Sequence, residues 1–313
     1  MLTISHNYYT IRGVDMLNFG EAERRILSYF VIGTNILYKG KEYTIVEADK
    51  PRCSNGEPKT DIFVRLHHGD IYEDIKISYK KENADFLENK TNAERAENLL
   101  GSNWRKIIQN STATIQDQFR SRALIYKEKF RKTEKGSMTL GWKFELLNKS
   151  SGDLSGRLEL SEEQVYDVYA GTNLTDDKKN AIVRGKKIQN SGIANYILNV
   201  DHISSAQEAI DKMIPISEYI HTNPHIYFAC KALNYRTFKS KYDGNRPLAV
   251  QVNWVVNDGK LDGNLVFDSP LEMNGTEMAT RLIHCLNLLG IHNTDDIDEN
   301  NADMNNVYRG EEK

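Results

Sequence analysis

The sequence predicts an α/β protein in which a mixed central sheet is flanked by helices. Apolar and polar residues alternate strictly over residues 61–78, which predicts two strands joined by a tight turn. Apolar residues recur at helical spacing over residues 20–32, and residues 91–131 are helical in character. With 39% hydrophobic and 27% charged residues among 313, the composition is that of a globular protein with a sizeable core.

The remaining elements follow from periodicity, capping residues and turn residues. They are short strands at 36–38 and 42–46, a hairpin over 140–160, helices over 162–169 and 204–213, a hairpin over 247–268 and a closing helix over 274–289.

Chain length and composition predict two structural units and a tail, with boundaries at 1–150, 151–292 and 293–313. The tail holds seven acids against two cations, so it is expected to be disordered. Because the formal net charge of the whole chain is −3, the rest of the chain is mildly basic. A mildly basic body is compatible with a nucleic-acid partner.

Cysteine usage and hydropathy indicate a cytoplasmic protein that does not enter a membrane. Cys53, Cys230 and Cys285 are far apart and form no CxxC pair, which argues against disulfides and a structural zinc site. Neither a signal peptide nor an apolar run of about 18 residues is present. The absence of P-loop, GxGxxG and GxSxG motifs argues against nucleotide-dependent and acyl-transfer chemistry.

The polar face of the 61–78 hairpin carries Asp61, Asp74 and Lys76, and two registers are open. If the turn begins at His68, Asp61 lies opposite Lys76 and diagonal to Asp74. If the turn begins one residue later, Asp61 lies opposite Ser78 and diagonal to Lys76. Either register keeps the two acids and the lysine on one face of the hairpin.

These residue types in this arrangement point to metal-dependent hydrolysis. Opposed side chains have Cβ atoms about 5 Å apart and diagonal ones about 7–8 Å. Two carboxylates at that separation can hold one divalent cation, and oxygen ligands suit Mg²⁺. A lysine beside them can orient a metal-bound water and stabilise charge on a phosphate.

This region resembles the PD-(D/E)XK nucleases, the superfamily of most type II restriction endonucleases. The resemblance is carried by Pro58-Lys59-Thr60-Asp61, by Asp74-Ile75-Lys76 and by the acidic helix start Gly20-Glu21-Ala22-Glu23. The elements follow one another in the family's order: a helix with a glutamate, a strand with the first acid and a strand with an acid-x-lysine triplet. Thr60 in place of proline and Asp74 in place of glutamate are departures from the commonest motif.

The resemblance implies a restriction-endonuclease-like core in residues 1–150. Residues 151–292 are expected to supply added DNA-recognition elements and to complete the core. It implies that Asp61 and Asp74 are metal ligands for Mg²⁺ and that Lys76 activates water. Glu23, or with less support Glu21, is the auxiliary acid.

Cations elsewhere are candidates for contacts with DNA phosphates. Residues 119–143 hold eight basic side chains against two acids, although a solvated helix face is the simpler interpretation of such a run. Residues 171–196 are a candidate for base readout, without any single residue standing out. The candidate DNA-binding residues are Lys59, Lys80, Lys81, Arg120, Arg122, Arg236, Lys239 and Lys241.

The function expected from the resemblance is Mg²⁺-dependent hydrolysis of double-stranded DNA by a sequence-specific type II restriction endonuclease. Palindromic targets would imply a homodimer, by analogy. Two alternatives stay open: a nuclease directed by DNA structure or modification on the same core, and a non-catalytic DNA-binding protein. In the second alternative, the hairpin is an ordinary pair of strands with a solvated polar face.

Overall fold

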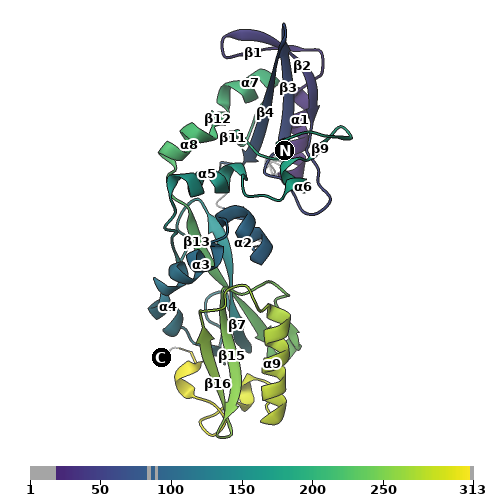
Figure 1. The fold of residues 1–313 in the computed structure, drawn as a ribbon. Coiled ribbons are helices and arrows are strands. Elements are labelled where there is room, and N and C mark those ends of the chain that lie inside the picture. The colour runs from purple at the N-terminus through teal and green to yellow at the C-terminus, as the bar shows by residue number, and fades with distance from the viewer. Residues whose placement is uncertain (1–18, 83–85, 89–90, 311–313) are drawn as a thin grey trace, which may run out of the picture.

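The described residues build two large β-sheets at opposite ends of an elongated molecule and a separate two-stranded sheet, β9–β10 (Figure 1). A computed structural model describes residues 19–82, 86–88 and 91–310. Helix α5 (Glu162–Ala170) lies between the two sheets in Figure 1. The mixture of helices and strands confirms the predicted α/β class, but the strands form two large sheets where one central sheet was expected. No helix in the described part of the chain has the length and apolar character needed to cross a bilayer.

The first sheet is mixed and has the strand order β1-β2-β3-β4-β11-β12. Its first four strands form an antiparallel meander, β11 lies parallel to β4, and β12 is antiparallel to β11. The strands are β1 (Asn35–Tyr38), β2 (Lys41–Asp49), β3 (Ile62–His68), β4 (Ile71–Lys80), β11 (Tyr196–Asn199) and β12 (Ile214–Pro215).

Helices α1 (Phe19–Tyr29) and α7 (Ala206–Lys212) cover the apolar face of the first sheet. Ala22, Ile26 and Phe30 recur every four residues, so one side of α1 and its end pack into this core. Ile62 and Ile77, which face each other on β3 and β4, are fully buried beneath them. The alternation that predicted the hairpin is therefore the division between this core and the opposite face.

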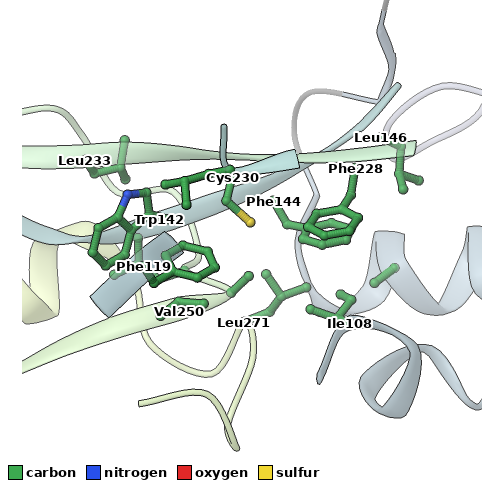
Figure 2. Close-up of a cluster of buried hydrophobic side chains, with 14 of the residues drawn as sticks. Ile108, Phe119, Trp142, Phe144, Leu146, Phe228, Cys230, Leu233, Val250 and Leu271 are labelled. Atoms are coloured by element: carbon green, nitrogen blue, oxygen red, sulfur yellow. The ribbon is translucent and has the colours of Figure 1, made fainter. Parts of the chain in front are cut away.

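The second sheet is built around two long paired strands, β7 (Ser137–Leu147) and β13 (Tyr227–Arg236). Strands β15 (Val250–Asn257) and β16 (Lys260–Val266) form the predicted second hairpin and extend the sheet beyond β7. Helix α9 (Gly275–Leu288) shares its hydrophobic core. Figure 2 shows part of that core, where the Phe144 and Phe228 rings stack with centroids 5.2 Å apart.

Shorter elements complete the chain. The helices are α2 (Ala93–Leu100), α3 (Trp104–Ala113), α4 (Gln116–Arg120), α6 (Asp176–Lys179) and α8 (Ile216–Thr222), with 3-10 turns at Thr237–Lys239, Thr294–Asp296 and Met304–Asn306. The strands are β5 (Phe86–Glu88), β6 (Ile125–Tyr126), β8 (Ser155–Arg157), β9 (Ile182–Val183), β10 (Lys186–Lys187), β14 (Lys241–Tyr242) and β17 (Val307–Tyr308).

Two local expectations differ from the structure. The predicted hairpin over 140–160 does not form, because β8 pairs with β13, and β13 also pairs along the length of β7. The predicted helical region over 91–131 ends at Arg120, and β6 follows it. In both places a strand from distant sequence provides the pairing partner, which local periodicity cannot reveal.

The two sheets do not divide at residue 150. Strand β7, which precedes residue 150, is central to the second sheet, whereas β11 and α7, which follow it, complete the first. The parallel pair of Tyr196 with Ile77 joins segments more than one hundred residues apart. A core confined to residues 1–150 would therefore lack one of its strands.

Residues 293–310 fold against the second sheet instead of forming the disordered tail that their composition predicts. Strand β17 lies parallel to β6, and Ile297 and Ala302 are buried. The acids in this segment serve as local caps, as when Asp296 accepts a hydrogen bond from the Asn293 backbone N–H at 3.1 Å. Such side-chain-to-backbone bonds let an Asn- and Asp-rich stretch adopt a defined course.

Candidate active site

The register of the β3–β4 hairpin decides which polar residues are neighbours. Arg65 lies opposite Asp74 and Phe63 opposite Lys76, so the turn is Gly69-Asp70, the second of the two predicted registers. Continued by one position, this register places Asp61 opposite Ser78. Asp74 then lies four positions further along β4, roughly 13 Å away at strand spacing. The predicted Asp61–Asp74 metal pair is not brought together.

The carboxylate of Asp74 is held by an arginine. Arg65 donates two hydrogen bonds to it, from Nε at 2.7 Å and from a terminal nitrogen at 2.8 Å. Glu47 lies 3.5 Å from the same guanidinium. This bidentate pair satisfies Asp74 without a metal ion, so the structure gives Asp74 the role of an ion-pair partner on the sheet face.

Lys76 is directed toward a loop and away from a carboxylate pair. Its Nζ donates to the Asn190 carbonyl oxygen at 3.2 Å, and its backbone N–H donates to the Asn195 side chain at 2.7 Å. Burial lowers the pKa of Lys76, and the charge of Asp74 opposes that shift. Lys76 therefore fastens the loop before β11 to the first sheet.

Asp61 has a different set of neighbours, at the end of the sheet where β3 begins and β4 ends. Its Oδ2 accepts a hydrogen bond from the Tyr79 backbone N–H at 2.8 Å. Burial raises the pKa of Asp61 to about 6, and the charge of Glu23 adds to that effect. Lys80 and Lys50 act in the opposite direction. Two acids and two lysines therefore influence one another at this end of the hairpin.

Glu23 reaches this end of the sheet from helix α1. The neighbouring Ala22 and Ile26 anchor the helix in the core, which leaves Glu23 at the edge of the buried face. Its Oε2 lies 2.5 Å from the Nζ of Lys50, and only 14% of the Glu23 side chain is exposed. Burial lowers the pKa of Lys50, but the ion pair with Glu23 outweighs burial and raises it.

Lys59 is buried, not exposed to a DNA backbone as the sequence suggested. It is 6% exposed, and its side chain packs on Gly171, where a Cβ atom would lie 2.5 Å from the lysine Cγ. Burial lowers the pKa of Lys59 to about 7, and the charges of Lys80 and Arg95 lower it further. Glu23, Lys50, Lys59, Asp61 and Lys80 are referred to below as the Asp61 cluster.

Of the other predicted DNA-binding residues, Lys81 is the sequence neighbour of Lys80, and the rest belong to other elements. Lys81 follows β4 directly and is partly buried. Arg120 is the last residue of α4, and Arg122, two residues beyond the helix, is ion-paired with Asp153 at 2.8 Å.

Three further candidates lie at the far end of β13 from the first sheet. Tyr227 at the other end of β13 pairs with Leu147 of β7, which also pairs with Phe86 of β5. Arg236 is nine positions from Tyr227, roughly 30 Å along the strand. Arg236 pairs with Asp243 at 2.7 Å, and Lys239 pairs with Glu134 at 2.6 Å. Lys241 is exposed on β14 in the same region.

Sequence reasoning missed two members of the Asp61 cluster. Lys50 follows β2 and has no motif around it, so nothing in the sequence signals its ion pair with Glu23. Lys80 was expected only as a phosphate contact, although its even spacing from Lys76 already placed it on the same face of β4. The end of the strand could have been found by extending the alternation beyond Ser78.

Among the described residues, no group of three or more His, Cys, Asp or Glu side chains is arranged to hold a metal ion. The Asp61 cluster contributes two carboxylates, which is the number that Mg²⁺ commonly takes from a protein when phosphate and water complete its shell. A search of protein families, of curated proteins and of solved structures found no match to this chain.

The raised pKa of Asp61 predicts a pH-dependent effect on stability. Because its folded-state pKa of about 6 exceeds its ordinary value of 3.8, the folded protein binds this proton more tightly than the unfolded chain. Ionisation of Asp61 therefore lowers the free energy of unfolding progressively from about pH 4 to pH 6, and the loss persists above that range. The Asp61→Asn variant should be more stable than the wild type at pH 7 and equally stable at pH 4, measured by urea unfolding. A difference that is constant with pH would contradict the assignment.

Gly192 supports the start of β3, and its replacement should weaken the fold. Its carbonyl accepts a hydrogen bond from the Lys59 backbone N–H at 3.0 Å, two residues before Asp61. A Cβ atom at Gly192 would lie 1.8 Å from the Lys178 carbonyl oxygen, so the backbone must move. Gly192→Ala is expected to lower the free energy of unfolding by about 1–3 kcal/mol in urea titrations. The exposed Gln189→Ala is the control, expected within about 0.5 kcal/mol of the wild type.

Proposed function

We propose that this protein is a Mg²⁺-dependent endonuclease that hydrolyses phosphodiester bonds in double-stranded DNA. One observation carries the proposal: Asp61, directly before β3, meets Glu23 of α1 and Lys80 of β4 at one end of the sheet, where their charges influence one another. Two acids beside lysines are the side chains that phosphodiester hydrolysis with a bound Mg²⁺ requires. In this proposal Asp61 and Glu23 are the two carboxylate ligands of Mg²⁺, the role that the sequence predicted for Asp61 and Asp74.

The order of the elements supports a PD-(D/E)XK-like assignment. A helix with a glutamate is followed by a strand that begins after an acid and by a strand that carries a lysine, as the resemblance requires. However, the lysine proposed to activate water is Lys80 and not Lys76. Because Asp61 lies opposite Ser78, Ser78-Tyr79-Lys80 occupies the position of the acid-x-lysine triplet, with a serine in place of the acid. Tyr79 faces the core, so Ser78 and Lys80 share the face of Asp61.

The residues of the Asp61 cluster fit a hard divalent cation. Asp61 and Glu23 offer carboxylate oxygens, and in this structure Lys50 compensates their negative charge. Bound there, Mg²⁺ supplies charge neutralisation at a phosphate and lowers the pKa of a water. Lys80 then positions the attacking water and stabilises charge on the phosphate. Lys59 is buried, and the charge of Lys80 acts on it, so in its protonated form it adds positive potential to the cluster.

The proposal is tested by incubating the purified protein with plasmid and phage DNA in Mg²⁺ or in EDTA. Discrete fragments that appear only with Mg²⁺ are expected, and they support a sequence-specific restriction endonuclease. A preference for branched or modified DNA favours the structure- or modification-directed nuclease. A gel shift that is independent of Mg²⁺, with all substrates intact, overturns the catalytic assignment and favours a DNA-binding protein.

A homodimer is the second part of the proposal and rests on symmetry alone. An enzyme that cuts both strands of a palindromic site uses two active sites related by the two-fold axis of the DNA. Light scattering of the protein with and without a cleaved duplex tests it, and a single copy per duplex would refute the homodimer.

A further inference from the structure

A basic β-hairpin projects from the first sheet close to the Asp61 cluster. Strands β9 and β10 pair as Val183 with Lys186 and as Ile182 with Lys187. The two residues between them, Arg184 and Gly185, both have positive φ angles (46° and 80°), as in the tight turns that join two-residue hairpins. In Figure 1 the teal segment beside the β9 label extends outward from the first sheet.

The hairpin itself contains cations and no acid, and two carboxylates lie beside it: Asp49 accepts from the Arg184 backbone N–H, and the pKa of Asp177 is lowered by hydrogen bonds from Ser54 and by the charge of Lys187. Residues 178–200 contain five lysines and arginines and no Asp or Glu. Arg184, Lys186 and Lys187 are exposed, and within the described residues none of the three forms an ion pair within 4 Å. Exposed Arg52 pairs through its backbone with Ile182 and adds a fourth cation at the base.

Backbone contacts fix the hairpin relative to the Asp61 cluster. The carboxylate of Asp49 accepts from the Arg184 backbone N–H at 2.8 Å and from the Lys50 backbone N–H at 2.9 Å. Lys50 in turn holds Glu23 through its Nζ. On the other side, Lys76 donates to the Asn190 carbonyl just beyond β10. A group bound by the hairpin is thereby held at a defined position relative to Asp61.

We propose that the hairpin at residues 182–187 enters the major groove of a DNA duplex and positions it for the Asp61 cluster, an inference that rests on the proposed nuclease function. The major groove of B-form DNA admits a two-stranded β-ribbon, and phosphates line both of its edges. A basic, two-stranded ribbon without acids matches that groove in shape and charge. Double-stranded RNA has a deep and narrow major groove that excludes such a ribbon, so the proposed partner is DNA.

The test compares Lys186→Gln/Lys187→Gln with Lys39→Gln/Lys41→Gln. Lys39 and Gly40 form a two-residue turn with similar positive φ angles (49° and 74°), and Lys41 follows it at the end of β2 that is eight residues, roughly 26 Å, from Asp49. Binding to a fluorescent duplex is measured in EDTA over a range of salt concentrations, so that cleavage does not interfere. Thermal melting verifies that each variant is folded.

The hairpin variant is expected to lower the slope of log affinity against log salt by about 1.8, about 0.9 for each lost phosphate contact. The control variant should bind DNA with the wild-type slope. When duplex RNA replaces DNA, the hairpin variant and the wild type should show the same slope. An unchanged slope, an equal loss in the control or an equal loss on RNA overturns the assignment. A wild-type protein that binds DNA but cleaves none refutes the nuclease alone, and one that binds no DNA refutes the hairpin too.

Discussion

Replacing Asp61 with asparagine is expected to lower Mg²⁺-dependent DNA cleavage by at least about 100-fold while the protein stays folded. Asparagine keeps the oxygen that accepts from the Tyr79 N–H, so the start of β3 is preserved. It removes the charge that would bind Mg²⁺ together with Glu23. Cleavage of a labelled duplex gives the rate, and calorimetric titration with Mg²⁺ alone should reveal weaker metal binding.

Asp74→Asn is the matched control on the same face of the hairpin. It removes one partner of the Arg65 ion pair, and at a partly exposed site this costs at most about 1 kcal/mol. Cleavage should stay close to the wild-type rate. If Asp74→Asn abolished cleavage and Asp61→Asn did not, the acid of the strand β4 triplet would be the ligand after all, and the Asp61 cluster would not be the active site.

Replacing Lys80 with methionine is expected to lower kcat by about 100- to 1,000-fold, the range seen when one preorganised group is removed from a transition state. Methionine retains most of the aliphatic stem but no charge, so the packing beside Lys59 and Asp61 is disturbed little. Because Lys80 is assigned to the attacking water and to the developing charge, KM for DNA should change much less than kcat. Single-turnover cleavage at saturating protein measures that step directly.

Lys76→Met provides the comparison for Lys80. Lys76 donates to the Asn190 carbonyl, so its loss should loosen the loop before β11 and leave the rate of the chemical step nearly unchanged. A large loss of kcat in Lys76→Met, with Lys80→Met active, would restore the lysine that the motif first suggested and would exclude the register-based assignment.

The alternating pattern of the β3–β4 hairpin allowed its strands and faces to be predicted from the sequence, but not its register. Alternation over residues 61–78 predicted β3, β4 and the side chains on each face, because burial of Ile62 and Ile77 requires that division. It could not choose the register. Shifting the turn from His68-Gly69 to Gly69-Asp70 moves each pair by two positions, which leaves every side chain on its own face. The apolar pattern is the same in both cases, although the neighbours of Asp61 differ.

Pairing between distant segments was likewise beyond the sequence. Composition predicted a disordered tail over residues 293–313, yet within the described part of that segment Ile297 and Ala302 are buried against the second sheet. The local pattern that suggested a 140–160 hairpin held no sign that β13, some eighty residues later, would pair with both β7 and β8. Such partners are selected by total burial and backbone pairing over the whole chain, not by local preference.

By itself the sequence determined the α/β class, the strand that follows Asp61, the strand that carries Asp74 and Lys76, and the helix that carries Glu23, because periodicity and burial act locally. The tertiary structure alone decided that Asp61 associates with Glu23, Lys50 and Lys80, while Asp74 pairs with Arg65. The physical reason is that electrostatic and hydrogen-bonding contacts depend on distances of a few ångströms between elements. Those distances follow from register and helix placement, which many local patterns satisfy equally well.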